Sequence, residues 1–596
     1  MALLILVLGA AIRFTNLGSE GLWCDEGYTA FAVREPLPTL LSRLLTVDDA
    51  PPLYYLVEKA AVSFVGRSEA GLRLASALAG VLSIVVLLWS AFRFRTPVRS
   101  RPGLVDAKDP DPNDAGHADA DRTNADQSRA DLWSAATLAF LTTGVFHARQ
   151  ARSYSLLLLF AIAFVLAARS LLTGRGSRTR KGSSWVLAVS GILLCLTHNV
   201  GIVLVLVSLV LWPLGTREGT SFRRWSLLHL PALAVSAMWI LGGSQLNVHS
   251  ELNVWTEHYW ESHSLALAPL YSMGLFVPGG IPSDDLAVGF SVPANLSRLW
   301  GGISVVCALA CLASVVGGRT RAVGAHSRAV AARSHPTAVA LRVELGLLLA
   351  PLVALTVVSL VVAPVYVLGR TDVLAYPAFA LLMGRGLSRL PKWPAFGILL
   401  FWGGLSLLSI APSYGYRDLG YAKGADRELA AQLGAELDSA DWLVHTFMTS
   451  PSIEYYLERA DVPHQTAWFP LVAGENTASD YPTPADSISS YVSQARRLRE
   501  TIEAQLPETG DVWIFGLVAP TTEDDWGRVR EAGVIDVGQL GYPVSVFLYQ
   551  LVGMRSVPVA YAYRQDWVAG DRVVLRVPKQ IWTPVDEIPD VRFEVR

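Results

Sequence analysis

Long apolar runs with almost no charge constrain this chain more than any other feature. Residues 345–367 contain no Asp, Glu, Lys or Arg, and 187–196 and 200–211 are equally apolar. About 20 consecutive apolar residues are enough for a helix to cross a bilayer. The whole chain of 596 residues is 52% hydrophobic and 17% charged, which is too apolar for a soluble protein of this length. We therefore expect a polytopic α-helical membrane protein.

Eleven segments are candidate membrane spans, with boundaries that are approximate. They are 2–16, 70–92, 133–149, 153–173, 184–198, 199–215, 225–243, 297–317, 341–363, 366–384 and 394–411. The first is short, and a cleavable signal peptide over 1–22 is the alternative. We favour a retained helix, because no basic leader precedes the apolar run and Arg13 interrupts it.

Basic residues predict the orientation, because cytoplasmic loops close to membrane ends are enriched in Lys and Arg. Clusters of basic residues follow the even-numbered spans, within 93–101, 175–181, 217–224, 319–333 and 385–392. All of these clusters fall on one side of the membrane. The sequence therefore predicts a multi-pass protein of the cell membrane with a cytoplasmic N-terminus and an extracytoplasmic C-terminal domain.

Two domains are expected, a transmembrane domain over 1–411 and an extracytoplasmic domain over 412–596, where charge returns to ordinary frequency. Within the first, 105–131 is rich in Asp, Ala and Asn and nearly lacks large apolar residues, so we expect a disordered cytoplasmic insertion. The second shows the alternating patterns of a mixed α/β domain. Strands are expected at 441–447, 512–518, 544–551 and 573–577, and helices around 429–437 and 488–502.

Composition also excludes several partners. The net charge is −2, and no basic run is interleaved with aromatic residues, so nucleic acid is not expected to bind. The four cysteines lack paired metal spacing, and three lie in apolar segments. We expect neither a zinc site nor a disulfide framework.

Adjacent acids follow the first apolar segment. Asp25 and Glu26 lie between Trp23 and Tyr28. Acids close to a membrane surface lose part of their hydration, which raises their basicity and makes them functional candidates. The alternative is that the two aromatic residues anchor the interface while the acids are only solvated.

A second acidic pair, Asp48 and Asp49, precedes Pro51 and Pro52, and an aromatic run begins at Tyr54. Paired prolines fix φ and favour an extended conformation just before them. We expect this segment to hold the two acids beside the membrane, ahead of an interfacial helix. A rigid turn without chemistry is the alternative.

Three arginines at expected external helix ends depart from the orientation rule. They are Arg149, Arg152 and Arg370, and Arg13 lies inside the first span. A guanidinium is well suited to bidentate binding of phosphate. Pairing with a carboxylate such as Asp372 or Glu26 is the structural alternative.

His198 and Asn199 lie at an expected external turn, close enough to the membrane surface to reach a polar headgroup. A single histidine in such a turn is also compatible with an ordinary hydrogen-bonded structural role.

Taken together, these segments resemble the superfamily of protein O-mannosyltransferases and aminoarabinose transferases, which are GT-C glycosyltransferases that use polyprenyl-phosphate sugars. The resemblance covers roughly residues 1–411, and the order of the motifs makes it specific. The matching residues are Arg13, Trp23-x-Asp25-Glu26, Asp48-Asp49-Ala50-Pro51-Pro52-Leu53-Tyr54-Tyr55, Ser68-Glu69 with Arg73-Leu74, Gln150-Ala151-Arg152-Ser153-Tyr154-Ser155-Leu156, Thr197-His198-Asn199-Val200-Gly201, and Gly369-Arg370 with Tyr376-Pro377-Ala378.

The resemblance implies an enzyme that moves one hexosyl or pentosyl group, with inversion, from a polyprenyl-phosphate sugar such as dolichyl phosphate mannose. The acceptor would be an external glycan, lipid or protein of the cell envelope, and membrane lipids would surround the bundle. The family's general base maps onto Asp25. The implied site has Asp25, Glu26 and Asp48 in catalysis, Arg13, Arg152 and Arg370 on the donor phosphate, and Tyr28, Asp49, Tyr54, Tyr154 and His198 on substrate.

Two departures from related families bear on the chemistry. Ala50 stands where the family usually has a histidine, so any substrate contact of that histidine is missing here. The tryptophan-tryptophan-aspartate motif of oligosaccharyltransferases is absent, which favours a single-sugar donor. A divalent cation such as Mg²⁺ or Mn²⁺ could share the charge of the leaving group, but the sequence has no closed ligand set, so a metal stays open.

The main alternative function is a polytopic transporter of a lipid or sugar. Such proteins commonly have internal repeats and polar residues near the bilayer midplane, and neither is found in this sequence. A receptor-like protein with a membrane anchor is a third class, for which eleven spans are excessive.

Overall fold

The structure is a computed structural model, and it divides into two compact units. One comprises Met1–Gly18 and Leu37–Gly415, here called the membrane unit; the other comprises Ser19–Pro36 and Tyr416–Arg596, here called the α/β unit. The sequence placed 19–36 with the transmembrane domain, whereas the structure groups this segment with the C-terminal region. The described residues are 1–46, 50–93, 112–174, 177–215, 220–245, 260, 264–277, 294–317, 336–362, 364–410, 425–446, 450–469, 488–517, 522–536, 543–564, 571–588 and 592–594.

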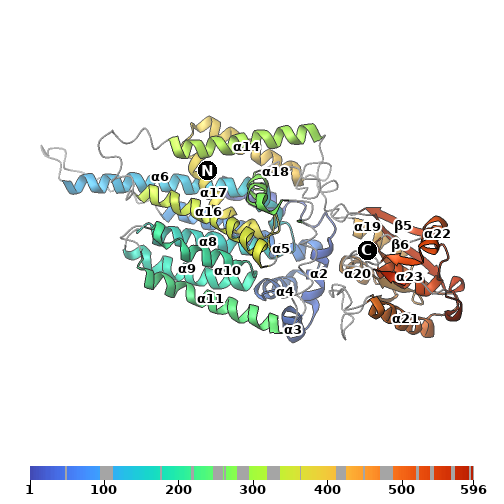
Figure 1. The fold of residues 1–596 in the computed structure, drawn as a ribbon. Coiled ribbons are helices and arrows are strands. Elements are labelled where there is room, and N and C mark those ends of the chain that lie inside the picture. The colour runs from blue at the N-terminus through green and yellow to red at the C-terminus, as the bar shows by residue number, and fades with distance from the viewer. Residues whose placement is uncertain are drawn as a thin grey trace. The chain divides into compact units, whose positions relative to one another are not determined.

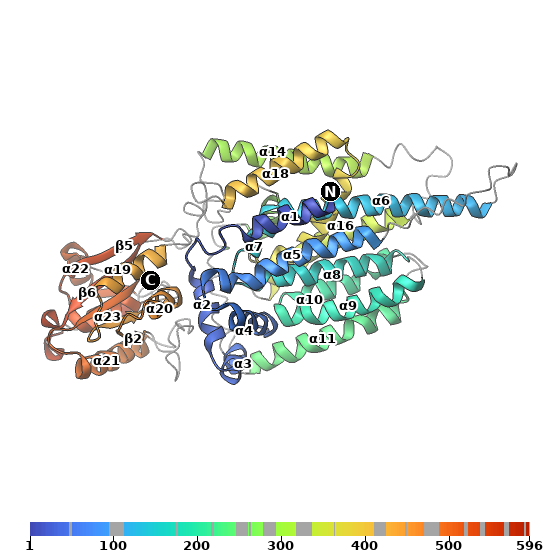
Figure 2. The same cartoon turned by 180° about the vertical axis from the view of Figure 1, so that it is seen from behind.

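The membrane unit is a bundle of helices in which α8, α9 and α11 run side by side (Figure 1). From behind, α1 lies along α5 and α6 (Figure 2). The helices are α1 (Ala2–Phe14), α3 (Leu37–Thr46), α4 (Leu53–Val65), α5 (Glu69–Arg93), α6 (Pro112–Phe140), α7 (Thr142–Ala148), α8 (Tyr154–Leu172), α9 (Ser177–Thr197), α10 (Gly201–Val210), η1 (Trp212–Leu214), α11 (Phe222–Gln245), η2 (Leu265–Leu267), α13 (Ala268–Leu275), α14 (Ala294–Gly317), α16 (Pro336–Val361), η3 (Thr371–Leu374), α17 (Tyr376–Leu387) and α18 (Lys392–Ile410).

Four helices in the described part of the chain are long and apolar enough to cross a membrane. They are Glu69–Arg93, Tyr154–Leu172, Phe222–Gly242 and Ala338–Val361, and they correspond to the expected spans 70–92, 153–173, 225–243 and 341–363. The described residues also include several shorter apolar helices. The polytopic helical class is therefore confirmed, and the count of eleven stays a prediction.

Three expected spans are not single helices. The segment 133–149 is divided at Leu141 between α6 and α7, and 199–215 contains α10 and then η1. The segment 366–384 begins irregularly and contains η3 before α17. Arg13 satisfies carbonyls at the end of α6, since its Nη1 donates to the Ala139 carbonyl at 3.1 Å and its Nη2 to the Leu138 carbonyl at 3.0 Å. Backbone groups freed inside a membrane need such internal partners.

The expected disordered insertion also differs from the structure. Residues 112–131 are helical within α6, and 105–111 lie outside the described residues. Gln127, Ser128 and Asp131 are buried, and partners on neighbouring helices satisfy their polar groups. A polar segment can be buried when each group is paired, which its composition does not reveal.

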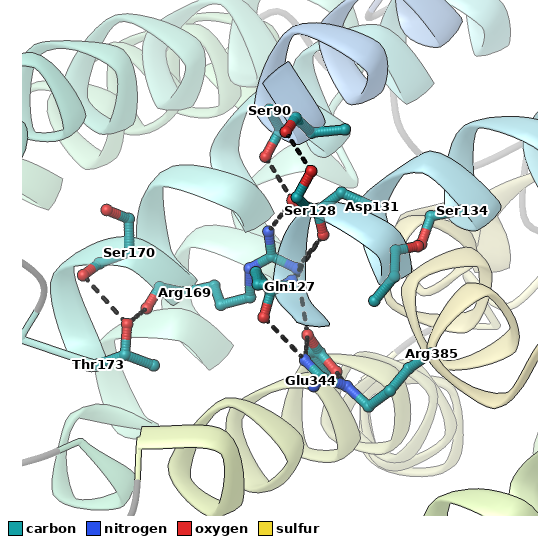
Figure 3. Close-up of polar contacts among 12 residues, drawn as sticks. Ser90, Gln127, Ser128, Asp131, Ser134, Arg169, Ser170, Thr173, Glu344 and Arg385 are labelled. Atoms are coloured by element: carbon teal, nitrogen blue, oxygen red, sulfur yellow. Dashed lines mark hydrogen bonds and ion pairs between the residues drawn. The ribbon is translucent and has the colours of Figure 1, made fainter. Parts of the chain in front are cut away.

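A buried ionic network joins α6, α8, α16 and α17 (Figure 3). Arg169 donates to both carboxylate oxygens of Asp131, at 3.0 and 2.9 Å, and to Glu344 at 3.2 Å. Arg385 donates to both oxygens of Glu344, at 2.9 and 2.6 Å. Two guanidinium and two carboxylate charges balance, and this pairing is what makes them tolerable within an apolar bundle.

The α/β unit is built on a five-stranded sheet in the order β2-β1-β3-β6-β5. β1 pairs in parallel with β2 and β3, and β6 is antiparallel to β3 and β5. β4 and β7 form a separate parallel pair. The elements are α2 (Cys24–Arg34), α19 (Ala425–Glu436), β1 (Trp442–His445), α20 (Ser450–Arg459), β2 (Gln465–Trp468), α21 (Ile488–Gln505), β3 (Asp511–Leu517), α22 (Glu523–Ala532), β4 (Val534–Asp536), α23 (Pro543–Val552), β5 (Val559–Arg564), β6 (Asp571–Pro578) and β7 (Arg592–Glu594), with short η5 (Lys579–Ile581) and η6 (Val585–Glu587).

Helices cover both faces of this sheet. Leu443 and Trp513 pack with Leu433 of α19 on one face, whereas Val444 and Ile514 pack on the other, with α21 and α23. Successive strand residues point to opposite faces, so a strand buried on both sides is a continuous apolar run. This explains why 512–518 could be recognised as a strand.

Three of the four expected strands are confirmed as β1, β3 and β6, but 544–551 forms α23 instead. This run is rich in β-branched and aromatic residues, yet it packs as a helix against α21 and β3. Packing against neighbouring elements decides the structure of such a short run, even where its residues individually favour a strand. The helices expected around 429–437 and 488–502 are present as α19 and α21.

Residues 19–36 pack against the C-terminal part of the α/β unit through α2. A Cβ on Gly27 would come within 2.5 Å of the Ser452 backbone nitrogen in α20, so the close approach requires glycine. The backbone N–H of Leu22 donates to the Tyr456 hydroxyl at 2.7 Å, which adds a second point of attachment.

Candidate functional site

Polar side chains gather at one end of the membrane unit, where α8 begins and α9 ends. Arg152 lies in the loop before α8, His198 in the turn after α9, and Arg370 in the turn before η3. The Tyr154 ring at the start of α8 lies 5.6 Å from the His198 ring. Because α8 and α9 pack together, the start of one is beside the end of the other. We call Arg152, His198 and Arg370 the arginine–histidine cluster.

Both arginines lie close enough to His198 for their charges to act on it. Burial, and then the positive charges of Arg152 and Arg370, lower the pKa of His198 to about 4. The imidazole is therefore neutral at pH 7. Its Nδ1 accepts the backbone N–H of Val200 at 3.3 Å, which leaves Nε2 to carry the proton. A neutral hydrogen-bond donor thus lies near two cations.

A tight turn positions Arg370. Gly369 has φ of +70°, in the left-handed region that glycine adopts most readily, and the Arg370 backbone N–H donates to the Val367 carbonyl at 3.1 Å. Asp372, the carboxylate expected as an alternative partner of an arginine, accepts a hydrogen bond from the Ser272 hydroxyl. Ser272 also contacts the Tyr366 hydroxyl at 2.8 Å, so Asp372 belongs to a hydrogen-bonded set of its own.

Ser76 of α5 fixes the loop that carries Arg152. The Ser76 hydroxyl donates to the Arg152 carbonyl at 3.0 Å, and the Ser155 hydroxyl donates to the Ser76 carbonyl at 2.7 Å. The backbone of Arg152 is therefore tied to α5 and to the first turn of α8. Its side chain is half-buried.

Tyr54 and Glu58 of α4 are polar residues close to Arg152. Burial, and then the negative charge of Glu58, raise the pKa of Tyr54, whereas the positive charge of Arg152 lowers it. Glu58 is fully buried one helical turn after Tyr54. Sequence reasoning missed this acid, although a lone carboxylate on the apolar face of 53–65 was a readable signal.

The structure gives Arg13 a different surrounding from the one expected. Besides its contacts at the end of α6, its Nη1 donates to the Gly9 carbonyl at 3.0 Å, and the side chain is buried. Arg149 acts similarly, since its Nη1 donates to Ile12 at 3.3 Å and its Nη2 to Asn16 at 3.3 Å, both at backbone carbonyls near the end of α1. Both arginines thus hydrogen-bond to backbone carbonyls at helix ends, and phosphate binding by Arg13 stays a prediction.

Three of the other expected site residues lie on α2 of the α/β unit. Asp25 is half-buried in its first turn, and Glu26 and Tyr28 are buried. A Glu26 carboxylate oxygen lies 3.5 Å from the backbone nitrogen of Trp23, as expected for an acid near a helix N-terminus. The structure thus accounts for part of the acidic pair through helix capping.

Asp48 and Asp49 lie outside the described residues. Among the residues that the structure does describe, no group of three or more His, Cys, Asp or Glu side chains is arranged to hold a metal ion. Binding of a divalent cation such as Mg²⁺ or Mn²⁺ therefore stays an open prediction.

The fold and the cluster define a polytopic membrane protein with a cationic site at one end of its bundle and an appended α/β unit. Its fold is that of ArnT, an aminoarabinose transferase of the GT-C family. The crystal structure of ArnT from Cupriavidus metallidurans bound to undecaprenyl phosphate matches with a TM-score of 0.53 and 15% identity, over 98% of this chain and 99% of that chain. The apo structure of the same protein matches with a TM-score of 0.53, 15% identity and 98% coverage of both chains. No protein-family model and no curated protein matches the sequence.

Proposed function

We propose that this protein is a membrane glycosyltransferase that moves a single sugar from a polyprenyl-phosphate donor to an external acceptor. The observation that carries the proposal is that Arg152 and Arg370 both lie close enough to His198 for their positive charges to lower its pKa. The fold supports it, because the ArnT structure that this chain resembles holds undecaprenyl phosphate. A lipid phosphate is the ligand class for which two guanidinium groups beside a neutral donor are suited.

The arginines are proposed to act on the leaving group. As the bond between the anomeric carbon and the phosphate oxygen breaks, negative charge grows on the phosphate. Cations fixed beside the phosphate then stabilise the transition state more than the ground state. The Nε2–H of His198 is proposed to donate to a phosphate or sugar oxygen without adding a charge.

The base is proposed from the sequence motif. Asp25 would remove the proton from the acceptor hydroxyl, which then attacks the anomeric carbon in one displacement with inversion. Glu26 and Asp48 are proposed to support the positive charge that develops on the sugar ring. The sugar would be a hexose or a pentose, and the acceptor a glycan, lipid or protein.

The basic loops support an orientation with the N-terminus in the cytoplasm. In this arrangement the arginine–histidine cluster lies at the external face, since it is at the opposite end of α8 from Arg169 and the basic loop that follows. The donor sugar would then be transferred outside the cytoplasm.

Mass spectrometry of external glycans and of lipid-linked sugars, in cells with and without this protein, tests the proposal. We expect one sugar residue to disappear from an external acceptor and its polyprenyl-phosphate donor to accumulate. Unchanged glycans together with an unchanged donor pool would contradict it.

A further inference from the structure

A cavity lies at the other end of the membrane unit from the arginine–histidine cluster. Its volume is about 190 Å³, and it is lined by α5, α6, α8, α9 and α16. Arg169 forms part of its lining and follows Arg152 by 17 positions along the chain, nearly all of them in α8, so the two lie about 25 Å apart. This cavity is therefore separate from the arginine–histidine cluster.

The lining changes from apolar to polar along the cavity. Val86, Leu166 and Val186 contribute an apolar wall, together with Ala163. The polar part consists of Ser90, Gln127, Arg169, Ser170, Thr173 and Ser183. Such a gradient suits a molecule with an acyl chain at one end and a polar group at the other.

The cavity borders the outer surface of the bundle. Two of its apolar lining residues are exposed there, Trp89 at 56% and Val186 at 38%. Leu82 and Val85 of the same helix α5 are also exposed apolar side chains. In a membrane protein such a surface faces lipid, so the molecule that reaches this cavity comes from the bilayer.

Arg93, which is exposed, lines the cavity at the end of α5. The Arg93 guanidinium lies over the Trp89 ring, 5.2 Å from its centroid, and a Cβ on Gly182 would be 3.6 Å from Arg93 Nη2. Arg93 thus reaches from α5 to the start of α9, where Lys181 is exposed. The ionic network beneath is neutral, because Arg169 and Arg385 are balanced by Asp131 and Glu344. The positive charge at this site therefore belongs to its rim.

We propose that this cavity binds a membrane phospholipid with an anionic headgroup. Its acyl chain would lie against Val86, Leu166 and Val186, and its phosphate at Arg93 and Lys181, with the hydroxyls of Ser170 and Ser183 beneath. These hydroxyls already face one another, with Ser183 donating to Ser170 at 3.0 Å. The bound lipid would fill the space beside the ionic network and stabilise the packing of α5, α8 and α9.

The test measures lipid bound to the purified full-length protein by native mass spectrometry, with phosphatidylglycerol and phosphatidylcholine as probes. One favourable contact between a cation and a headgroup corresponds to roughly a fivefold preference. We expect phosphatidylglycerol to bind at least about fivefold more tightly than phosphatidylcholine. Arg93→Gln should remove most of this preference, and Lys392→Gln, which changes an exposed cation at the start of α18, should not.

Filling the cavity provides an independent variant. Ala163 is only half-buried, so Ala163→Phe can occupy the cavity without entering the core, and we expect it to abolish binding of both lipids. In the unmodified protein, a photoactivatable phosphatidylglycerol should label peptides that contain 163–170 and 183–186. Equal binding of both lipids, labelling elsewhere only, or full competition by soluble glycerol 3-phosphate would overturn the proposal. None of these readouts depends on glycosyl transfer.

Discussion

At the residue scale, several residues that the sequence motifs named lie close together in the structure, and their roles stay predictions. The structure places Arg370 near His198, together with Arg152 and Tyr154. Arg370 lies more than 200 positions from Arg152 in the sequence, and only the order of the motifs indicated that the two belong together. The backbone contacts of Arg13 could not be predicted, because its carbonyl partners lie at the end of α6, where α6 breaks at Leu141.

The proposed base gives the first prediction. Asp25→Asn keeps nearly the same side-chain volume but removes basicity, so sugar transfer should fall by about 100-fold or more, while binding of undecaprenyl phosphate persists. Turnover of the purified variant with a polyprenyl-phosphate sugar checks this. Near-normal turnover in a folded Asp25→Asn protein would exclude Asp25 as the base.

His198 gives a prediction on pH. Its pKa of about 4 in the folded state lies below the ordinary value of about 6.5, so its contribution to stability is present above about pH 6.5 and is lost as the pH falls toward 4. NMR of ¹⁵N-histidine should therefore show His198 neutral, with the proton on Nε2, at about pH 5.5.

His464 is an internal reference for this experiment. Burial lowers the pKa of His464, but its hydrogen bonding to Glu454 and the negative charge of Glu454 outweigh burial, so the pKa lies above the ordinary value. His464 should titrate above His198. A His198 that titrates together with His464 would contradict the proposed pair of neighbouring arginines.

At the element scale, length and apolar composition predicted whole helices better than their breaks. The expected spans 70–92 and 153–173 match α5 and α8 closely, because an uninterrupted apolar run has few alternatives in a membrane. The break at Leu141 and the helical state of 544–551 depend on neighbouring elements, which a local pattern does not contain.

The contact between α2 and α20 gives an element-scale prediction with a matched control. Gly27→Ala places a methyl group against the backbone of Ser452, so we expect the α/β unit to lose about 1–3 kcal/mol of stability. Gly527→Ala lies in α22 with no atom within 4 Å of the added Cβ, and it should be neutral or stabilising. Thermal unfolding of both variants checks this, and equal melting temperatures would exclude the close contact.

At the scale of the whole molecule, the sequence predicted a membrane part followed by an α/β part, and the ArnT fold agrees with that arrangement. It did not reveal that 19–36 belongs to the α/β unit. That docking depends on Gly27 and Leu22 meeting α20, more than 400 positions away, and no local periodicity records such a contact.

The orientation gives a prediction for the intact cell. In a background without the native Cys24, a cysteine introduced at the exposed Glu508 should react with a membrane-impermeant maleimide, and one at the exposed Lys181 should not. This result is expected if the basic loops are on the cytoplasmic side, as the orientation rule predicts. The reverse labelling pattern would place the arginine–histidine cluster on the cytoplasmic face and exclude external transfer.

Binding of undecaprenyl phosphate to the purified full-length protein tests the central claim most directly. Lysine keeps the charge but cannot form the bidentate contact, so Arg152→Lys and Arg370→Lys should each weaken binding by about tenfold. Arg67→Lys changes an exposed arginine in the turn between α4 and α5, and should bind as the parent does. Weakening in both cluster variants with an unchanged control is the result we predict. Parent-like affinity in Arg152→Lys and Arg370→Lys alike would contradict the assignment of the lipid phosphate to this cluster.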